Sequence, residues 1–303
     1  MIPIIFFGTH EFAAIILKAL LDSGLFDIQK VITMPDRPAG RSHKLKLSAV
    51  KTAAGRHGLT IGQPENLENY TSSGSQQLNI VVDYGLIIPL NIIETPKFGS
   101  VNIHPSLLPK YRGASPIQSA LINGKKETGV TIMKMDKEMD HGPILAQEKV
   151  SIKPEDNYVS LYKKLAERAA EMIVKIIPLY IEDKIKLKEQ NHGTATFTKI
   201  LSREDGKINF KTRTADEIYN LWRGLTPWPG IFCEWNGKRL KLIKIAKNDK
   251  KSPAGKASVE NKKISIGCRQ GSIIAEELQM EGKKSMTAET FLNGYQKIDG
   301  YVF

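Results

Sequence analysis

The sequence predicts an α/β domain followed by a smaller all-β domain. Short apolar runs alternate with amphipathic helical stretches through the first half of the chain, a pattern typical of parallel βαβ units. Five closely spaced strand-like runs then occupy about the last 100 residues, as in a small barrel. We therefore expect an open, Rossmann-like, mostly parallel sheet in the N-terminal domain and an OB-like β-barrel in the C-terminal domain.

The elements of the first half can be placed in order. Ile2–Phe7 is an apolar run that ends at Gly8, and Thr9 is the candidate N-cap of a helix that extends to Leu21. The strands predicted to follow are Ile28–Thr33, Leu78–Val82, Ser100–Ile103 and Gly129–Met135, and they precede a long helix over Asn157–Tyr180.

The last third of the chain has a different pattern. Lys184–Asn191 is polar and basic without a packing pattern, which indicates a linker, and a helix is predicted from about Thr214 to Trp222. The predicted barrel strands are Ile231–Trp235, Arg239–Ile245, Lys256–Val259, Lys263–Ile266 and Ser272–Gln279, with turn signals such as Asn236-Gly237 between them. We expect a first domain over residues 1–183, a basic linker over 184–204 and a second domain over 205–303.

Composition excludes several classes of protein. The chain has 303 residues, 41% hydrophobic and 25% charged, which is ordinary for a globular protein and unlike a collagen-like or disordered one. Its two cysteines are too few for a disulfide scaffold. No apolar run approaches the roughly 18 residues of a membrane span, and the first residues do not form a signal-peptide pattern. These observations predict a cytoplasmic protein with no membrane partner.

The charge is strongly positive and unevenly distributed. The formal net charge is +12, and residues 190–303 carry 20 Lys and Arg against 12 Asp and Glu, an excess of eight. A polyanionic partner would explain this excess, because each neutralised phosphate releases counterions. A solvated basic surface that only maintains solubility is the alternative.

Several common motifs are missing from the sequence. There is no GxxxxGK[ST], GxGxxG, HExxH or CxxC, which argues against a P-loop hydrolase, a standard dinucleotide enzyme and a zinc protease. The turn at Gly8-Thr9 offers backbone N–H groups to an anion or is only a helix cap.

The dense segment, SVNIHPSLLPKYRGASPIQ, places Asn102 and His104 on one face at the end of a strand. An amide donor beside an imidazole suits the oxyanion that forms at a carbonyl. An acid from the downstream loop, Asp136 or Asp140, would orient the ring or take up a proton. An Asn-x-His pair is also common as a purely structural feature, so spacing alone leaves both readings open.

Longer motifs add a family resemblance. NIHPSLLPKYRG followed by TGVTIMKMDKEMDHG resembles the signature of formyltetrahydrofolate-dependent formyltransferases. VITMPDRPAGR, VVDYGLIIP and SLLPKYRGASPIQ resemble the methionyl-tRNA formyltransferase family within it, and the likeness covers nearly the whole chain. The resemblance implies a catalytic trio of Asn102, His104 and Asp140. The chain departs from the family's pattern at three positions. His141 stands where the family usually has Thr, His10 where Pro is common, and Asp83 where Ala is common.

The resemblance also implies the reaction and its partners. The formyl group of 10-formyltetrahydrofolate moves to the α-amine of methionine on initiator tRNA, with no metal, and we expect a monomer. The residues expected to bind folate are Tyr84, Gly85, Leu86, Ile87, Ile88, Ser106, Leu107, Leu108, Pro109, Asp136, His141 and Gly142. Those expected to bind tRNA are Arg37, Arg41, Lys44, Lys46 and Lys51 in a basic loop, and Lys186, Lys188, Lys238 and Arg239 in the linker and barrel.

Three other functions share parts of this pattern. A formyltransferase acting on a small amine, such as an amino-sugar nucleotide or glycinamide ribonucleotide, would have the same trio but no reason for the basic loop and tail. A hydrolase of formyltetrahydrofolate would replace the amine with water. A non-enzymatic RNA-binding protein would not need an intact trio.

Overall fold

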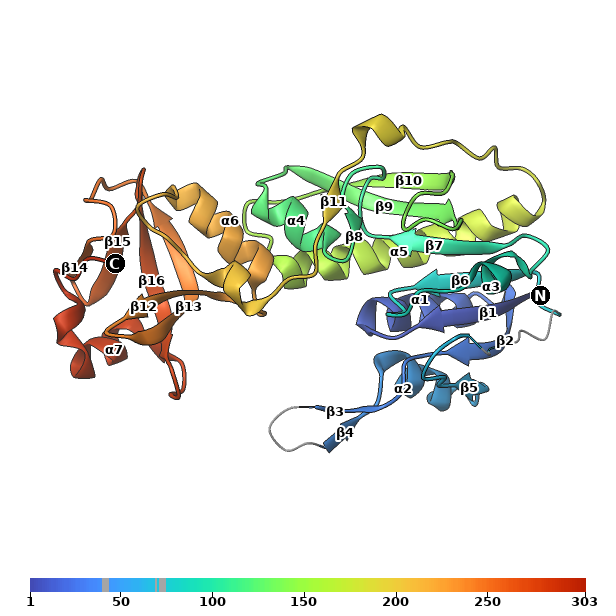
Figure 1. The fold of residues 1–303 in the computed structure, drawn as a ribbon, viewed down its shortest axis with the longest axis horizontal. Helices are drawn as coiled ribbons and strands as arrows, with labels where there is room; N and C mark the ends of the chain where they lie inside the picture. The colour runs from blue at the N-terminus through green and yellow to red at the C-terminus, as the bar shows by residue number, and fades with distance from the viewer. Residues whose placement is uncertain (40–43, 69, 71–74) are drawn as a thin grey trace. The chain divides into compact units, whose positions relative to one another are not determined.

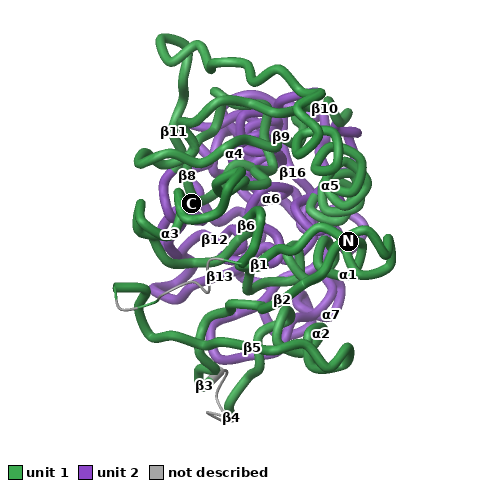
Figure 2. Tube along the Cα trace, turned by 90° about the vertical axis from the view of Figure 1, so that its right-hand side faces the viewer, with its two compact units in different colours: residues 1–116, 127–151, 162–198 green, residues 117–126, 152–161, 199–303 purple. Residues whose placement is uncertain are grey.

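The chain divides into two compact units in a computed structural model, which describes residues 1–39, 44–68, 70 and 75–303. The N-terminal unit comprises residues 1–116, 127–151 and 162–198, and the C-terminal unit comprises 117–126, 152–161 and 199–303 (Figure 2). These units differ from the predicted division at residue 183, because two segments that precede that residue, 117–126 and 152–161, belong to the C-terminal unit. Residues 184–198, expected as a linker, pack within the N-terminal unit.

A seven-stranded sheet forms the centre of the N-terminal unit. Its order is β10-β9-β7-β6-β1-β2-β5 (Figure 1). The strands are β1 (Ile2–Gly8), β2 (Phe26–Ile32), β5 (Ile61–Gly62), β6 (Leu78–Val82), β7 (Ser100–His104), β9 (Glu127–Lys134) and β10 (Ile144–Ser151). Strands β5, β2, β1, β6 and β7 are parallel, whereas β9 and β10 are antiparallel to their neighbours. The predicted mostly parallel sheet is confirmed.

The direction of strand order reverses between β1 and β6. From β1 the chain proceeds outward to β2 and β5, and it then returns to the other side of β1 to form β6 and β7. Ligands of open α/β sheets bind beyond the carboxyl ends of the strands at such a switch point. This edge of the sheet is therefore the place to look for a site.

Apolar side chains cover both faces of the central strand. Ile4, Ile5, Phe6 and Phe7 alternate between the faces, yet each is at most 2% exposed. A strand that is buried on both sides reads as a continuous apolar run, which is why β1 is clear in the sequence.

The helices of the N-terminal unit are α1 (Glu11–Asp22), α2 (Ala49–Arg56), α3 (Leu90–Glu94), and the parts of α4 (Pro116–Ile122) and α5 (Tyr158–Ile181) that lie in this unit. The two predicted helices of the first half, α1 and α5, begin within a few residues of the predicted positions, whereas α2, α3 and α4 were not predicted. The prediction that Thr9 caps α1 is wrong. His10 is the N-cap residue and makes no side-chain cap. The Thr9 hydroxyl instead donates to the carbonyl of Tyr84 at 2.5 Å. That bond joins the loops after β1 and β6.

Two short strand pairs extend from the main sheet of the N-terminal unit. An antiparallel pair joins β3 (Arg37–Ala39) and β4 (Lys44–Lys46) in the basic loop. A parallel pair joins β8 (Arg112–Gly113) to β11 (Phe197–Thr198), segments far apart in the sequence. The second pair connects the loop after β7 to residues near the end of the unit.

The C-terminal unit is built on an antiparallel sheet, as predicted. Its path is β12-β13-β16-β15-β14, with β17 paired to β16. The strands are β12 (Ile231–Trp235), β13 (Lys238–Asn248), β14 (Ala257–Glu260), β15 (Lys263–Gly267), β16 (Ser272–Met280) and β17 (Met286–Thr287), with helices α6 (Ala215–Leu225) and α7 (Ala288–Gly294). Thr214 and Glu217 form a capping box that starts α6.

Membrane-spanning helices are not found among the residues that the structure describes: none of their helices is both long and apolar enough to cross a bilayer.

Candidate active site

Strand β7 presents two polar side chains near its carboxyl end. Asn102 and His104 lie opposite Met133 and Thr131 of β9. Because side chains two residues apart share a face of a strand, the amide and the imidazole project to the same side. Asn102 is partly exposed and His104 is buried.

The third polar group comes from the loop between β9 and β10. This loop folds back tightly, since the amide of Lys134 donates to the carbonyl of Pro143 at 2.8 Å. Gly142 is required at the closest approach, because a Cβ there would lie 2.0 Å from the Lys134 carbonyl oxygen. Asp140 adopts a left-handed conformation with φ 53°, a conformation that short polar side chains tolerate. Its carboxylate is thereby directed to β7.

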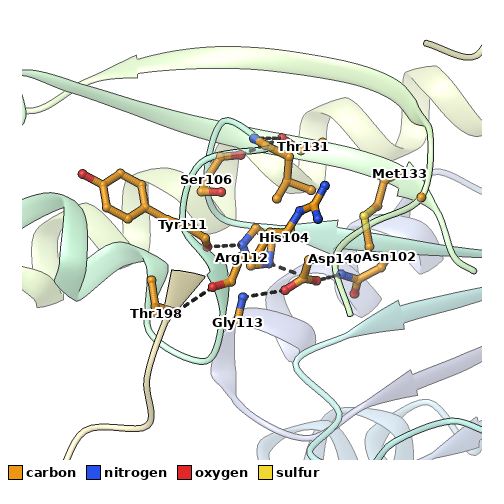
Figure 3. A network of polar contacts seen from close by, with 12 residues as sticks. Asn102, His104, Ser106, Tyr111, Arg112, Gly113, Thr131, Met133, Asp140 and Thr198 are labelled. Atoms are coloured by element: carbon orange, nitrogen blue, oxygen red, sulfur yellow. Dashed lines mark hydrogen bonds and ion pairs between the residues drawn. The ribbon is translucent and has the colours of Figure 1, made fainter. Parts of the chain in front are cut away.

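Asn102, His104 and Asp140 converge, as the sequence predicts (Figure 3). Asp140 Oδ1 lies 3.4 Å from Asn102 Nδ2 and 3.5 Å from His104 Nδ1. Asp140 Oδ2 accepts a hydrogen bond from the backbone amide of Gly113 at 2.8 Å. The carboxylate therefore accepts from the Asn102 side-chain amide and the Gly113 backbone amide, and it faces His104 Nδ1.

The tautomer of His104 is set by a backbone carbonyl. His104 Nε2 lies 2.9 Å from the carbonyl oxygen of Tyr111, which only accepts, so Nε2 carries a proton. Tyr111 presents this carbonyl from a left-handed conformation, φ 60°. Nδ1 is then the nitrogen that faces Asp140, and it is unprotonated whenever the ring is neutral.

The loop after β7 is fixed by the strand beside it. Thr131 Oγ1 donates to the carbonyl of Ser106 at 2.6 Å and accepts from the amide of Leu108 at 3.2 Å. Gln147 Nε2 donates to the carbonyl of Leu108 and to Thr131 Oγ1. Ser106 and Leu108 are buried within this arrangement. They support the loop directly, whereas a folate contact from Ser106, Leu107, Leu108 or Pro109 remains a prediction.

The loop after β6 combines buried and exposed side chains. Tyr84 and Ile88 belong to the core cluster on one face of the sheet, and Leu86 packs against it; burial raises the pKa of the Tyr84 hydroxyl to about 12. Ile87 is 86% exposed, and Gly85 has φ 102°. The side chains of Tyr84 and Ile88 are thus committed to packing, which leaves backbone groups and Ile87 for a ligand.

A pocket of about 490 Å³ lies between α3 and the first residues of the Asp140 loop. It is lined by Leu90, Ile93, Met135, Asp136 and His141 among others. Ligand pockets are commonly 300–1,000 Å³ in volume. The pocket is therefore large enough for part of a heterocyclic ligand beside the loop that carries Asp140.

His141 is held on two sides. Its Nδ1 lies 2.7 Å from Asp136 Oδ2, and its ring stacks on that of His192 with centroids 3.9 Å apart and planes 6° apart. His192, from a distant segment, covers one face of the ring, and the His141 side chain remains 28% exposed. Asp136, the competing acid, contacts His141 and so is engaged outside the trio.

The residues expected to bind tRNA show different degrees of freedom. Arg37, Lys46, Lys186, Lys188 and Lys238 are exposed. Lys51 forms an ion pair with Asp36, and the Arg239 guanidinium lies 4.2 Å from the centre of the Phe232 ring. Arg41 lies outside the described residues. Lys44 is placed in β4 by its backbone.

Sequence reasoning missed the residues that support the trio. Arg112 and Gln190 are both 4% exposed, and Arg112 Nη2 donates to Gln190 Oε1 at 2.7 Å. Arg112 belongs to the KYRG motif that carries the family resemblance, and its place in that motif was a usable signal. Gln190 had none, because it lies in a polar stretch that resembles a linker. Over the described ranges, no three His, Cys, Asp or Glu side chains gather in a way that holds a metal ion.

Comparison with known families identifies the class of protein. Residues 2–177 match the formyl transferase family, and residues 200–296 match the formyl transferase C-terminal domain. The first match alone covers more than half of the chain, so the chain is a member of the formyl transferase family.

Full-length relatives define the family more closely. The chain is 38% identical over 306 residues to the methionyl-tRNA formyltransferase of Geotalea uraniireducens, with 99% of this chain and 97% of the relative covered. It is 42% identical over 302 residues to that of Thermodesulfovibrio yellowstonii, with 98% and 97% covered. The chain belongs to the methionyl-tRNA formyltransferase family.

Solved structures share the fold. The N-formyltransferase from Helicobacter canadensis, in complex with folinic acid and dTDP-3-aminofucose, superimposes with a TM-score of 0.68 at 22% identity, covering 91% of this chain and 99% of that one. HypX from Aquifex aeolicus in complex with tetrahydrofolic acid gives a TM-score of 0.65 at 16% identity, covering 97% and 47%.

Proposed function

We propose that this chain transfers the formyl group of 10-formyltetrahydrofolate to the α-amine of methionine esterified to initiator tRNA. The observation that carries the proposal is the convergence of Asn102, His104 and Asp140 at the carboxyl end of β7. Relatives that carry the name methionyl-tRNA formyltransferase, alike over nearly the whole chain, support the choice of substrate.

The amine nitrogen bonds to the formyl carbon of the co-substrate to give a tetrahedral intermediate, and the bond from that carbon to the folate nitrogen breaks afterwards. The protein's task is to stabilise the negative charge that develops on the formyl oxygen. Asn102 Nδ2 is one donor. His104 donates from Nδ1 only as an imidazolium, because Nε2–H is committed to the Tyr111 carbonyl. The Asp140 carboxylate, 3.5 Å away, stabilises that cation.

Asp140 also has the position of a proton carrier. The attacking amine must be neutral, and a free α-amino group titrates at about 7.7–8.0. The adjacent ester withdraws electrons and lowers that pKa, so much of the amine is uncharged near neutral pH. The amine loses its proton after it bonds to the formyl carbon. Asp140 accepts that proton and returns it to the departing folate nitrogen, held in place by the Gly113 amide.

The folate site is proposed between the loop after β6 and the Asp140 loop. Backbone groups of residues 84–88 offer donors and acceptors to the edge of a flat heterocycle, and the pocket beside Asp136 and His141 offers room. Two solved structures of the same fold were obtained in complex with folinic acid or tetrahydrofolic acid. This arrangement assigns binding to the backbone rather than to the buried side chains of Tyr84 and Ile88.

The basic surface supplies the affinity for tRNA in this proposal. The exposed Arg37 and Lys46 lie on the β3–β4 pair, and Lys186 and Lys188 lie in the irregular segment that follows α5, where Lys188 forms an isolated bridge with Ile144. Phosphate contacts of this kind position a nucleic acid without reading its sequence. A small amine would give no reason for them.

A formyl-transfer assay tests the proposed function. Charged initiator tRNA, charged elongator tRNA and an amino-sugar nucleotide are each offered with 10-formyltetrahydrofolate, and product is measured over time. We expect rapid transfer to the initiator tRNA and transfer at least 100-fold slower to the other two. Release of formate without any amine acceptor would indicate the hydrolase, and preference for the sugar would indicate the small-amine enzyme.

A further inference from the structure

Two buried side chains behind the trio form an arrangement that the proposed mechanism does not use. Gln190 Nε2 donates to the carbonyl oxygens of Asp140 at 3.0 Å and of Gly142 at 2.8 Å. Gln190 Oε1 accepts from Arg112 Nη2 at 2.7 Å and from Arg112 Nε at 3.3 Å. The amide group of Gln190 is thus used on both sides.

The same segment of chain also holds the residue that contacts the Asp140 carboxylate. Thr198 pairs with Gly113 in the β8–β11 pair, and the amide of Arg112 donates to the Thr196 carbonyl at 2.8 Å. Thr198 Oγ1 donates to the carbonyl of Arg112 at 3.0 Å. The amide of Gly113 is therefore aimed at Asp140 Oδ2 by residues 196–198, while Gln190 holds the Asp140 backbone.

On this basis, and resting on the proposed function, we infer that Gln190 is a positioning residue that sets the location of the Asp140 carboxylate. Asp140 has a left-handed backbone, which a short polar side chain tolerates but does not by itself select. The two hydrogen bonds from Gln190 Nε2 hold the carbonyls of Asp140 and Gly142 in this arrangement. Only an amide fits this place, since it donates to two carbonyls and accepts from a guanidinium at once.

His192 extends the arrangement to the pocket. Its Nδ1 lies 2.8 Å from Arg112 Nη2, and a guanidinium only donates, so Nδ1 is unprotonated and accepts. The His192 ring stacks on His141. Residues 190–198 therefore contact the Asp140 loop at three successive positions: the carbonyl oxygens of Asp140 and Gly142, and the ring of His141.

A double-mutant cycle tests the inference. Gln190→Met removes the polar contacts to Asp140, Gly142 and Arg112 at nearly constant volume, and Asp140→Asn removes the carboxylate that the contacts position. We expect Gln190→Met to lower kcat for formyl transfer at least tenfold with KM for charged tRNA within twofold. In the Asp140→Asn background the same change should lower kcat less than twofold. An equal factor in both backgrounds would overturn the inference.

Gln147→Met is the matched control for the cycle. Gln147 also donates two hydrogen bonds in the same unit, at 2.8 Å to the Leu108 carbonyl in the loop after β7 and at 2.9 Å to Thr131 Oγ1 on β9, but it does not contact Asp140 in any described interaction. Its effect on kcat, whatever its size, should be the same factor in both backgrounds. If the Gln147 effect also vanished with Asp140→Asn, coupling would not be specific to Gln190 and the positioning role would fail.

A second variant guards against loss of folding. Gln190→Glu keeps the volume and pairs its charge with Arg112, but its carboxylate repels the carbonyls of Asp140 and Gly142. We expect it to fold and to lose kcat at least tenfold; parent-like kcat would contradict the inference.

Hydrogen exchange at the Gly113 amide gives a readout that requires no substrate. We expect exchange at least tenfold faster in Gln190→Met than in the parent chain and in Gln147→Met, because Asp140 Oδ2 no longer stays within reach. Unchanged protection of the Gly113 amide would overturn the positioning role, whether or not the parent chain transfers a formyl group. Absence of formyl transfer by the parent chain would instead refute the proposed function.

Discussion

At the scale of single residues, backbone conformation determines the geometry around His104 as much as side-chain identity does. Tyr111 and Asp140 are both left-handed, and each uses that conformation to face His104, one with a carbonyl and one with a carboxylate. The sequence predicted Asn102, His104 and Asp140 because a strand register and a family motif fix them. It could not predict the Tyr111 contact, since the turn that presents a carbonyl has no side-chain signature.

His10 and Asp83, two departures from the family pattern, contact each other. His10 Nδ1 lies 3.1 Å from Asp83 Oδ2 across the β1–β6 switch point, and the hydrogen bond to Asp83 raises the pKa of His10 above its usual value near 6.5. Because the folded-state pKa is raised, the stabilisation is fully present below about pH 6.5 and is lost as the pH rises through the folded-state pKa. Both side chains are substantially exposed, so its size is below about 1 kcal/mol.

We therefore predict that His10→Gln flattens the pH dependence of stability. Between about pH 6 and pH 8, the parent chain should lose a few tenths of a kcal/mol more in free energy of unfolding than the variant does. Urea denaturation at both pH values measures this. Parallel pH profiles for the two proteins would show that the pair contributes nothing.

At the scale of elements, the sequence predicted the strands and helices that can be identified from their own apolar pattern alone. β1, β6 and α5 carry such patterns. β10 was missed because it is an edge strand whose residues are buried mainly at Ile144 and Leu145. The segment 190–198 was taken for part of a linker because its one buried side chain is polar, and its contacts are with residues far away in the sequence.

Two threonines of β9 provide a stability test. The Thr128 hydroxyl is buried and forms no hydrogen bond within the described part of the chain, whereas the Thr131 hydroxyl contacts Ser106, Leu108 and Gln147. We expect Thr128→Val to stabilise by about 1 kcal/mol and Thr131→Val to destabilise by about 2–3 kcal/mol. Thermal unfolding of both variants checks this; destabilisation by Thr128→Val comparable to that of Thr131→Val would contradict it.

In the C-terminal unit, one arginine ties α6 to the segment that begins α5. Buried Arg223 donates to the carbonyls of Lys153, Pro154 and Asp156 at 3.1–3.2 Å and to Asn220 Oδ1 at 2.7 Å. Arg223→Met should cost about 2–4 kcal/mol in free energy of unfolding, because three carbonyls, among them the buried carbonyl of Asp156, lose a charged donor.

The exposed Arg203 provides the control for this change. Arg203→Met should change the free energy of unfolding by no more than about 0.5 kcal/mol. Denaturant unfolding compares the two variants, and equal effects would show that the contacts of Arg223 add nothing.

At the scale of the whole molecule, the net charge of +12 is the property that bears on the partner. The sequence places an excess of eight positive charges in residues 190–303 but does not show which cations of the chain remain free. The structure shows that Lys51 is paired with Asp36, while Lys186 and Lys188 are exposed. A monomeric state and a cytoplasmic location remain predictions.

Binding of tRNA should weaken steeply with salt. Between 50 and 200 mM salt we expect the affinity for charged initiator tRNA to fall by tenfold or more, and Lys186→Ala and Lys188→Ala each to reduce the slope of log K against log salt by about one. Filter binding or fluorescence titration measures the slopes. A salt-independent affinity would refute the phosphate-contacting surface.

The most direct measurement of the central claim is the single-turnover rate of formyl transfer in Asn102→Ala. With charged initiator tRNA and 10-formyltetrahydrofolate both saturating, we predict a rate about 10²–10³-fold below that of the parent chain. The dissociation constant for tRNA should stay within threefold, because Asn102 acts on the reacting oxygen and not on the nucleic acid. A rate within fivefold of the parent would contradict the claim that this amide stabilises the developing charge.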